Sequence, residues 1–332
     1  MRIFIATGVY PPDIGGPAQY SKSIEEEFEK TGHGVTIGHY TIEKNLPVGI
    51  RHFVFFLKAC KAFLFCECAI AMDTFSVGFP TVVASKIFGK KVVLRVAGDF
   101  LWESYVERTG HLITIRDFYA RMPELSVKEK IILWVTRRIV SWCDRLVFST
   151  EWQRDIWVSA YNIKKNNTAI IENYFRKFEG EVPTVKNFVW AVRPLKLKNG
   201  RLLYRAFAEA RKKYPDLVLD DGRYPYEEIL KRVQSCYAVI LPSISDVSPN
   251  LILDAVAYGK PFIMTKENGY FEKFKSIGLF VDPFSEKDIA EKIEILADDT
   301  KYQEYAQKVQ NYSYSHSYTE IASEYLKLFN KL

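Results

Sequence analysis

Two basic side chains follow a predicted strand in the second half of the chain. Arg193 and Lys198 come directly after the apolar run 188–192, which is typical of a buried β-strand. Open α/β sheets bind ligands at the carboxyl ends of their strands, so a ligand could reach these cations there. Arginine offers a bidentate fork and lysine a point charge, and together they can neutralise a diphosphate. The alternative is an exposed basic loop without a ligand.

A helix start follows the predicted strand 237–241. Ser248 is a natural helix cap, and Pro249 fits the first helical position, where a missing N–H costs nothing. The backbone amides of Asn250 and Leu251 would then lack acceptors inside the helix and be open to an anion.

Two aspartates flank this helix start. Asp246 lies in the loop before it, and Asp254 lies about one and a half turns into the helix. Carboxylates accept hydrogen bonds from sugar hydroxyls, often two at once. Asp246 could equally be a solvated loop acid. Asp254 sits in an apolar run, and a buried carboxylate is costly unless it is paired or binds a ligand.

A glycine-rich loop occupies residues 10–17, YPPDIGGP, between the first predicted strand and a helix. Gly15 and Gly16 allow close approach of the backbone to a ligand, and Pro17 fits the first helical position. The helix amides would then form an anion site, although a plain tight turn explains the loop equally well. The loop is not a G-x-G-x-x-G fingerprint, which counts against a dehydrogenase.

The elements that position these residues alternate between short β-rich runs and helical patterns. This alternation predicts an α/β fold with parallel sheets covered by helices on both faces. The predicted strands are 2–7, 35–40, 68–72, 91–96, 145–149, 168–171, 188–192, 216–219, 237–241, 261–265 and 279–281. Helical patterns fill the gaps between them, for example 18–30, 76–88, 127–142, 200–213 and 286–297, and the chain ends in a predicted helix, 318–332. The chain of 332 residues is long enough for two domains, and the polar stretch 175–186 is the predicted boundary.

Composition excludes several classes of protein. The net charge of +6 is a mild surplus, so a nucleic-acid partner is not expected. The five cysteines form no C-x-x-C pair, which favours free thiols in a reducing compartment and no metal site. P-loop and G-x-S-x-G motifs are missing. The first residues predict a strand rather than a signal peptide, and the most apolar window, 53–66, is too short to span a bilayer. We therefore expect a cytoplasmic protein, at most attached to the inner face of the membrane.

The order of the motifs along nearly the whole chain resembles family 4 of the retaining glycosyltransferases (glycosyl transferases group 1). The matching motifs are Tyr10–Gly16, Gly32–Val35, Arg193 with Lys198, Asp246 and Asp254 followed by Ala255–Pro261, and Val281–Pro283. Three features depart from the family pattern. Both signature acids are Asp instead of Glu, Val192 replaces a glycine, and the stretch 216–237 is short by one strand–helix unit. Asp220, Asp221 and Gly222 would stand in for that unit, which in the family helps to hold the base.

The resemblance implies a GT-B fold, in which two Rossmann-like parallel-sheet domains face each other across a cleft. The N-terminal, acceptor-side domain would comprise 1–175, with the final helix, 313–332, packed back on it. The C-terminal, nucleotide-sugar-binding domain would comprise 187–312.

The resemblance also implies roles for the residues above. Arg193 and Lys198 would bind the diphosphate, and Asp254 the ribose. Asp246 would contact the donor sugar, helped by the backbone of Ser248, Pro249, Asn250 and Leu251, while Gly15 and Gly16 would face the phosphates from the other domain. Asp99 is the polar candidate nearest to the reacting sugar. The catalytic set would thus be Asp246, Arg193, Lys198 and Asp99.

The implied function is a retaining, metal-independent hexosyltransferase in polysaccharide or glycolipid biosynthesis. It would use a UDP- or GDP-linked sugar as co-substrate, no cofactor, and a glycan or lipid-linked acceptor. The departing phosphate would take the acceptor proton, while the protein supplies positioning and charge. Because both signature acids differ, a non-catalytic nucleotide-sugar-binding partner or sensor is the alternative, and a hydride-transfer enzyme is less favoured.

The stretch 111–138 mixes basic and apolar residues. Its cations are Arg116, Arg121, Lys128, Lys130, Arg137 and Arg138, with Ile131 and Trp134 among them. A basic, apolar helix can lie on an anionic bilayer, which would suit a lipid-linked acceptor. The alternative is that 131–140 is a core helix with charged flanks.

Overall fold

The computed structural model describes residues 1–13 and 16–332, which form two compact units. Unit 1 comprises Met1–Ser104, Tyr119–Asn173 and Ser317–Leu332, and unit 2 comprises Tyr105–Phe118 and Tyr174–His316. The sequence analysis assigned 105–118 to the N-terminal domain, whereas this segment packs with unit 2. It does so because its backbone and side chains bond to loops of that unit, described below.

Unit 1 is built on six parallel strands in the order β2-β1-β3-β4-β5-β6. Five of them are β1 (Arg2–Thr7), β2 (Gly34–His39), β3 (Cys68–Ala71), β4 (Lys91–Val96) and β5 (Arg145–Phe148), and β6 (Thr168–Ile170) forms one edge. The central strands are apolar on both faces, as parallel strands covered by helices require.

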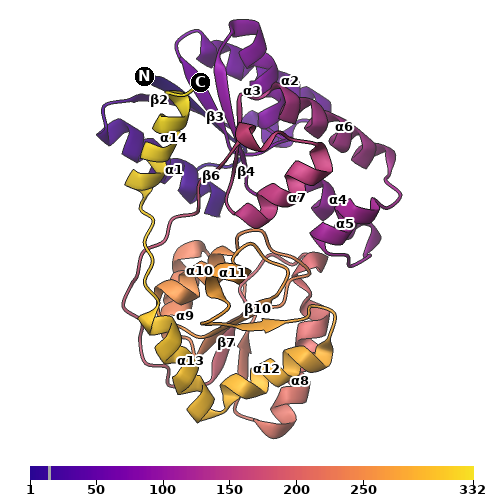
Figure 1. Cartoon of the computed structure of the whole chain (residues 1–332), viewed down its shortest axis with the longest axis vertical. Coiled ribbons are helices and arrows are strands. Elements are labelled where there is room, and N and C mark those ends of the chain that lie inside the picture. Colours follow the sequence, from indigo (N-terminus) through magenta and orange to yellow (C-terminus); the bar gives the residue numbers. More distant parts are fainter. Residues whose placement is uncertain (14–15) are drawn as a thin grey trace. The chain divides into compact units, whose positions relative to one another are not determined.

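The helices of unit 1 cover both faces of this sheet. They are α1 (Gly16–Lys30), α2 (Val48–Phe63), α3 (Gly78–Phe88), α6 (Val127–Trp142), α7 (Glu151–Tyr161) and α14 (Tyr318–Phe329), with the short η1 (Ile42–Asn45) and η2 (Lys165–Asn167). Two further helices, α4 (Phe100–Thr109) and α5 (Ile115–Arg121), belong partly to each unit. Right-handed crossovers put α1 on one face and α2, α3 and α6 on the other, and α3 packs against both α2 and α6 (Figure 1).

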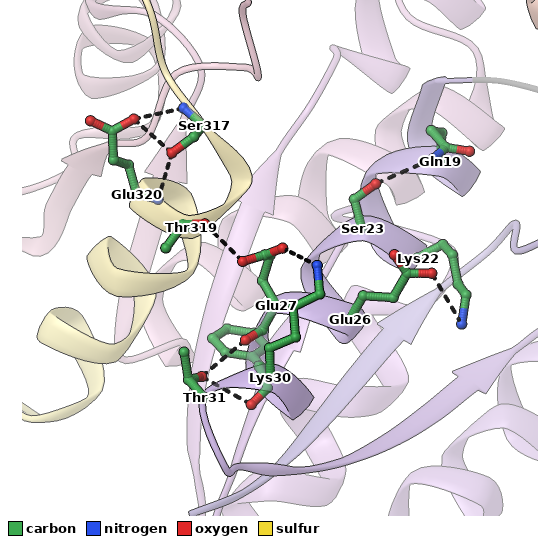
Figure 2. Close-up of polar contacts among 11 residues, drawn as sticks. Gln19, Lys22, Ser23, Glu26, Glu27, Lys30, Thr31, Ser317, Thr319 and Glu320 are labelled. Atoms are coloured by element: carbon green, nitrogen blue, oxygen red, sulfur yellow. Dashed lines mark hydrogen bonds and ion pairs between the residues drawn. The ribbon is translucent and has the colours of Figure 1, made fainter.

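The last helix, α14, packs against α1, so the two ends of the chain share one side of unit 1 (Figure 1). Figure 2 shows how the two helices are joined: the Thr319 hydroxyl donates to the Glu27 carboxylate (2.8 Å), which also pairs with Lys30 (2.7 Å). Ser317 and Glu320 form a capping box at the start of α14. These contacts fix where the C-terminal segment lies on unit 1.

Unit 2 holds five parallel strands in the order β11-β10-β9-β7-β8. They are β7 (Asn187–Val189), β8 (Val218–Asp220), β9 (Ala238–Leu241), β10 (Phe262–Thr265) and β11 (Leu279–Val281). The helices are α8 (Gly200–Lys213), α9 (Tyr226–Ser235), α10 (Asn250–Ala257), α11 (Phe271–Phe274), α12 (Glu286–Ala297) and α13 (Asp299–Asn311), with the short η3 (Lys196–Lys198). Helices α8 and α12 pack together on one face, and α9 packs with α10 on the other.

The predicted α/β class with two parallel sheets is confirmed. Each predicted strand has a counterpart, and boundaries differ by at most three residues, as at β7, which the sequence extended to 192 but which ends at Val189. As expected, 221–237 holds a single helix, α9, between β8 and β9, and β8 therefore forms an edge of the sheet.

Candidate functional site

The loops that follow the strands of unit 2 are bonded to one another at the carboxyl edge of its sheet. Asn199, after β7, donates through Nδ2 to the carbonyl oxygens of Pro242, after β9 (3.1 Å), and Pro283, after β11 (2.6 Å). The Ile244 amide donates to the Leu197 carbonyl (2.9 Å). Asn199 is only 4% exposed, so these loops form one rigid platform.

An ion pair lies on this platform. The Lys198 Nζ lies 2.6 Å from Oδ2 of Asp246, and the Ser243 hydroxyl donates to the same oxygen at 3.3 Å. Both charged side chains are largely buried. The backbone of Asp246 is held too, since its amide donates to the Glu267 carbonyl. The predicted phosphate-binding cation and the predicted sugar-binding acid are therefore brought into direct contact.

Lysine carries three N–H donors, and a single bond to Asp246 leaves capacity for an anion. A phosphate oxygen arriving beside this pair would meet a charge held in place, because Asp246 restrains the lysine. Charge-assisted hydrogen bonds of this type are roughly twice as strong as neutral ones. The arrangement suits an anion that carries a hydroxyl-bearing group. Lys198 would bind the anion, and Asp246 would accept hydrogen bonds from the hydroxyls.

Arg193 lies at the exposed start of the same loop, four residues beyond the end of β7. Among residues 1–13 and 16–332, no hydrogen bond or ion pair engages its guanidinium. The structure thus places Arg193 near the platform in sequence but joins it to neither Lys198 nor Asp246. An exposed arginine without a protein partner can contact an anionic ligand, and its bidentate fork matches a phosphate.

Helix α10 begins later than the sequence predicts. Pro249 is the residue before the helix, and its carbonyl accepts from the amides of Ile252 (3.0 Å) and Leu253 (3.1 Å). Ser248 does not cap the helix, because its hydroxyl donates to that of Tyr270 (3.1 Å) instead. The first helical residue is Asn250, which is exposed. In the first turn of any helix the amides have no carbonyl acceptors within the helix, and the helix dipole is positive there. This end of α10 therefore still favours an anion.

Asp254 lies in α10 and is held by a partner that the sequence analysis did not identify. The Tyr226 hydroxyl, at the start of α9, donates to Oδ1 of Asp254 at 3.1 Å. Burial raises the pKa of the Asp254 carboxyl to about 7, and the bond from Tyr226 opposes this rise. A desolvated carboxyl with one protein donor can accept further hydrogen bonds from ligand hydroxyls. No contact joins Asp254 to Lys198 or Asp246 in the described part of the chain.

The two acids at the end of β8, Asp220 and Asp221, contact nearby side chains of unit 2. Asp220 pairs with Arg232 (2.8 Å) and accepts from the Tyr224 hydroxyl (2.7 Å), while Arg232 stacks on the Tyr224 ring. Asp221 accepts from the Tyr204 hydroxyl (2.6 Å). These acids are thus engaged in structural contacts, and their expected role in holding a base remains a prediction.

The glycine-rich loop of unit 1 is only partly described. Gly15 lies outside the described residues, while Gly16 opens α1, so Pro17 is the second residue of the helix and not the first. The part of the loop before the glycines is anchored, because Lys44 pairs with Asp13 (2.5 Å). The phosphate-facing role of Gly15 and Gly16 stays a prediction.

Asp99, the candidate catalytic residue of unit 1, is occupied by structural contacts. Oδ1 accepts from the Trp102 amide (2.9 Å), and Oδ2 accepts from the Tyr119 hydroxyl (2.7 Å) and the Trp157 indole (2.9 Å). The residue is 1% exposed, and burial raises the pKa of its carboxyl while these donors oppose the rise. Asp99 therefore joins α4, α5 and α7, and this geometry does not support a catalytic role.

Asn199 is the residue that sequence reasoning missed. It adopts a left-handed conformation (φ 61°) just before Gly200. An Asn-Gly pair at the start of a helix signals a special turn, so its backbone could have been anticipated. Its partners lie 43 and 84 residues away, and no local pattern reveals them.

Part of the chain is similar in sequence to known proteins. Residues 221–316 match the family Glycosyl transferases group 1. A Campylobacter jejuni relative, N,N'-diacetylbacillosaminyl-diphospho-undecaprenol alpha-1,3-N-acetylgalactosaminyltransferase, is 29% identical over 108 residues. That alignment covers 32% of this chain and 29% of the relative, so the match spans less than a third of either protein.

Solved structures match over the full length. The chain superimposes on HepE from Anabaena, crystallised with UDP and glucose, with a TM-score of 0.70 at 15% identity, covering 100% of both chains. Sucrose-phosphate synthase from Thermosynechococcus elongatus gives a TM-score of 0.74 at 14% identity, covering 99% of this chain and 98% of that one. Residues 221–316 thus resemble the glycosyl transferases group 1, and the whole chain has the two-sheet GT-B fold.

Proposed function

We propose that the protein is a glycosyltransferase that moves a hexose-type sugar, with retention of configuration and without a metal ion, from a nucleotide-diphosphate sugar to a glycan or lipid-linked acceptor. The observation that carries this proposal is the Lys198–Asp246 ion pair on the platform of unit 2. It combines a cation for a diphosphate with an acceptor for sugar hydroxyls at the carboxyl edge of a parallel sheet.

In this mechanism, transfer depends on stabilising the departing nucleoside diphosphate. Lys198 donates to its oxygens from a fixed position, and Arg193 closes on it from the exposed loop. The first amides of α10 add the positive end of a helix. Asp246 accepts hydrogen bonds from the sugar hydroxyls, and Asp254 accepts them from the ribose. The leaving phosphate oxygen takes the acceptor proton, so no side-chain base is needed.

The choice of donor and acceptor follows the comparisons. HepE was crystallised with UDP and glucose, which favours a UDP-linked donor, with GDP as the other choice. The name of the Campylobacter relative includes a diphospho-undecaprenol, which favours a lipid-linked acceptor at the cytoplasmic face of a membrane.

A thermal-shift screen over UDP-, GDP-, ADP- and TDP-sugars tests the proposal. A donor that binds only the folded protein raises the melting temperature. We expect one donor series to do so, Lys198→Ala to lose the effect, and Lys212→Ala, a matched lysine exposed on α8, to keep it. No shift with any donor would overturn the proposal. Binding without release of nucleoside diphosphate, in the presence of membrane extract as acceptor source, would instead favour the non-catalytic partner or sensor.

A further inference from the structure

Helix α2 exposes a row of large apolar side chains. Ile50, Phe53, Leu57 and Leu64 recur at intervals of three, four and seven residues, which places them on one face of a helix, and each is more than half exposed. Phe65 follows at 61% exposed. The stretch 48–66 contains no Asp or Glu, so the charges that accompany this row are all positive.

Helix α6 has a similar outer face. Val127 (75% exposed), Ile131 (53%), Trp134 (56%) and Trp142 (40%) point away from the core. They alternate with the exposed cations Lys128, Lys130, Arg137 and Arg138. The single acid of the helix, Glu129, is buried in the capping box at its start. The inner side of α6, with Ile132, Val135 and Ile139, is core, as one of the two expectations for this stretch states. Contact of the outer side with a bilayer stays a prediction.

Both helices pack against α3. Between them α3 adds the exposed Ile87 and Lys86. We call the exposed residues of α2, α3 and α6 the α2–α6 surface. It is apolar, carries positive charge, and presents no exposed acid from any of the three helices.

A basic helix of unit 2 shows what an ordinary solvent face looks like. On α8, Arg205 pairs with Glu286, Lys212 with Glu209, and Lys213 with Glu294. Three of its five cations are thus neutralised by acids, and Tyr204 is its one large hydrophobic residue that is exposed. The α2–α6 surface differs in both respects. The half-buried Lys58 of α2 pairs with Glu43, but in residues 1–13 and 16–332 no ion pair engages the exposed cations of the surface, and its exposed apolar side chains are numerous and large.

We propose that the α2–α6 surface docks the protein on an anionic phospholipid bilayer. Apolar side chains with lysine and arginine around them are the combination that inserts shallowly among anionic headgroups. A second copy of the chain fits less well, because a two-fold contact would set this surface against itself and bring like charges together. No helix in residues 1–13 and 16–332 combines the length and apolar character needed to cross a bilayer, so docking would be peripheral.

This inference deepens the proposed function, because a lipid-linked acceptor lies in such a bilayer. It differs from the sequence expectation by including α2 and by excluding the stretch 111–121, whose N-terminal part packs within unit 2.

Vesicle co-sedimentation tests the proposal without any donor present. We expect the wild type to bind vesicles containing 30% phosphatidylglycerol, chosen as the probe, and to bind pure phosphatidylcholine about tenfold more weakly or less. Phe53→Ser/Leu57→Ser, Ile131→Ser/Trp134→Ser and Lys130→Glu/Arg137→Glu should each weaken binding about tenfold. The matched controls are Phe284→Ser, an exposed apolar residue of unit 2, and Lys212→Glu/Lys213→Glu, and both should bind as the wild type does.

Unchanged melting temperatures would show that the variants fold. The proposal would be overturned if the wild type bound neither kind of vesicle. It would also be overturned if the α2 and α6 variants bound phosphatidylglycerol vesicles as strongly as the wild type does. Oligomers in the absence of vesicles that these variants abolish would overturn it too, because they would assign the surface to a second copy. Nucleotide-sugar binding, measured separately, distinguishes the two proposals: vesicle binding without donor binding refutes the transferase and leaves this inference standing.

Discussion

Buried or half-buried aspartates lie near the carboxyl ends of strands in both units, but their hydrogen-bond partners differ. In unit 1, Asp73 accepts from the amides of Ser76 (2.6 Å) and Val77 (3.0 Å), and Asp99 accepts from three donors. In unit 2, Asp246 is paired with a lysine, and Asp254 has one hydroxyl partner. Asp73 and Asp99 hold the fold of unit 1 together, whereas Asp246 and Asp254 have partners that a ligand can share or supplement.

This difference shows how an acid with a structural role can be separated from an acid with a binding role. A buried carboxylate surrounded by fixed donors has its hydrogen-bonding capacity used and gains nothing from a ligand. A carboxyl that is desolvated with few donors carries a cost that a ligand hydroxyl can relieve. The predictions below test the two kinds of site against each other.

The largest effect is expected from Asp99→Ala, which leaves three buried donors without an acceptor. We expect a loss of about 3–5 kcal/mol in the free energy of unfolding, measured by chemical denaturation. Asp155→Ala, at an exposed acid of α7, should change it by less than about 0.5 kcal/mol. If Asp99→Ala kept wild-type stability but abolished transfer, the structural assignment of Asp99 would be wrong.

Lys198→Ala should weaken nucleoside-diphosphate binding about 30- to 100-fold, because a charge-assisted hydrogen bond to phosphate, worth about 2–3 kcal/mol, is lost. Isothermal titration calorimetry measures this. The same variant should bind the free nucleoside as the wild type does, because the nucleoside has no phosphate. Equal losses for diphosphate and nucleoside would indicate general damage to the platform, not a phosphate contact.

Asp254→Asn should weaken donor binding about tenfold, because the ribose hydroxyls lose a charged acceptor. Stability at pH 8 should not fall, since burial disfavours the ionised carboxyl that the amide replaces. A nucleotide without ribose hydroxyls should bind the variant and the wild type equally well. If the variant bound both nucleotides normally, Asp254 would have no part in the donor site.

The pH dependence of binding gives a smaller and more specific effect. The pKa of the Asp254 carboxyl is about 7 in the folded protein, against 3.8 ordinarily, so the carboxylate forms as pH rises through neutrality. Donor affinity should therefore increase about tenfold from pH 6 to pH 8. The folded state binds more protons than the unfolded chain between these two pKa values, so stability should fall as pH rises through that window. Because the donor phosphates titrate equally for both proteins, Asp254→Asn serves as the control. Relative to this variant, the gain in donor affinity and the fall in stability should appear only in the wild type.

Much of the fold could be predicted from local patterns. The strands β1, β4 and β11 and the helices α6, α8 and α12 begin and end where the sequence predicts. The period of apolar residues and the capping residues are enough for this. The start of α10 was misplaced, because Ser248 and Pro249 have the right types for a helix start, while the hydroxyl of Tyr270 competes for the serine.

The site could be predicted only in part, for the same physical reason. The proximity of Lys198 and Asp246 follows from their positions after parallel strands. The separation of Asp99 from the binding acids does not, since it depends on Tyr119 and Trp157, which are 20 and 58 residues away. The partners of a polar group determine its role, and a single sequence does not show which distant residues become partners.

Hydrogen–deuterium exchange with a bound nucleotide sugar tests the central claim most directly. The account predicts that saturating donor slows amide exchange in unit 2 at 196–200, at 243–251 and around Asp254, because these segments form the platform and the start of α10. Protection confined to unit 1, with these three segments unchanged, would contradict it.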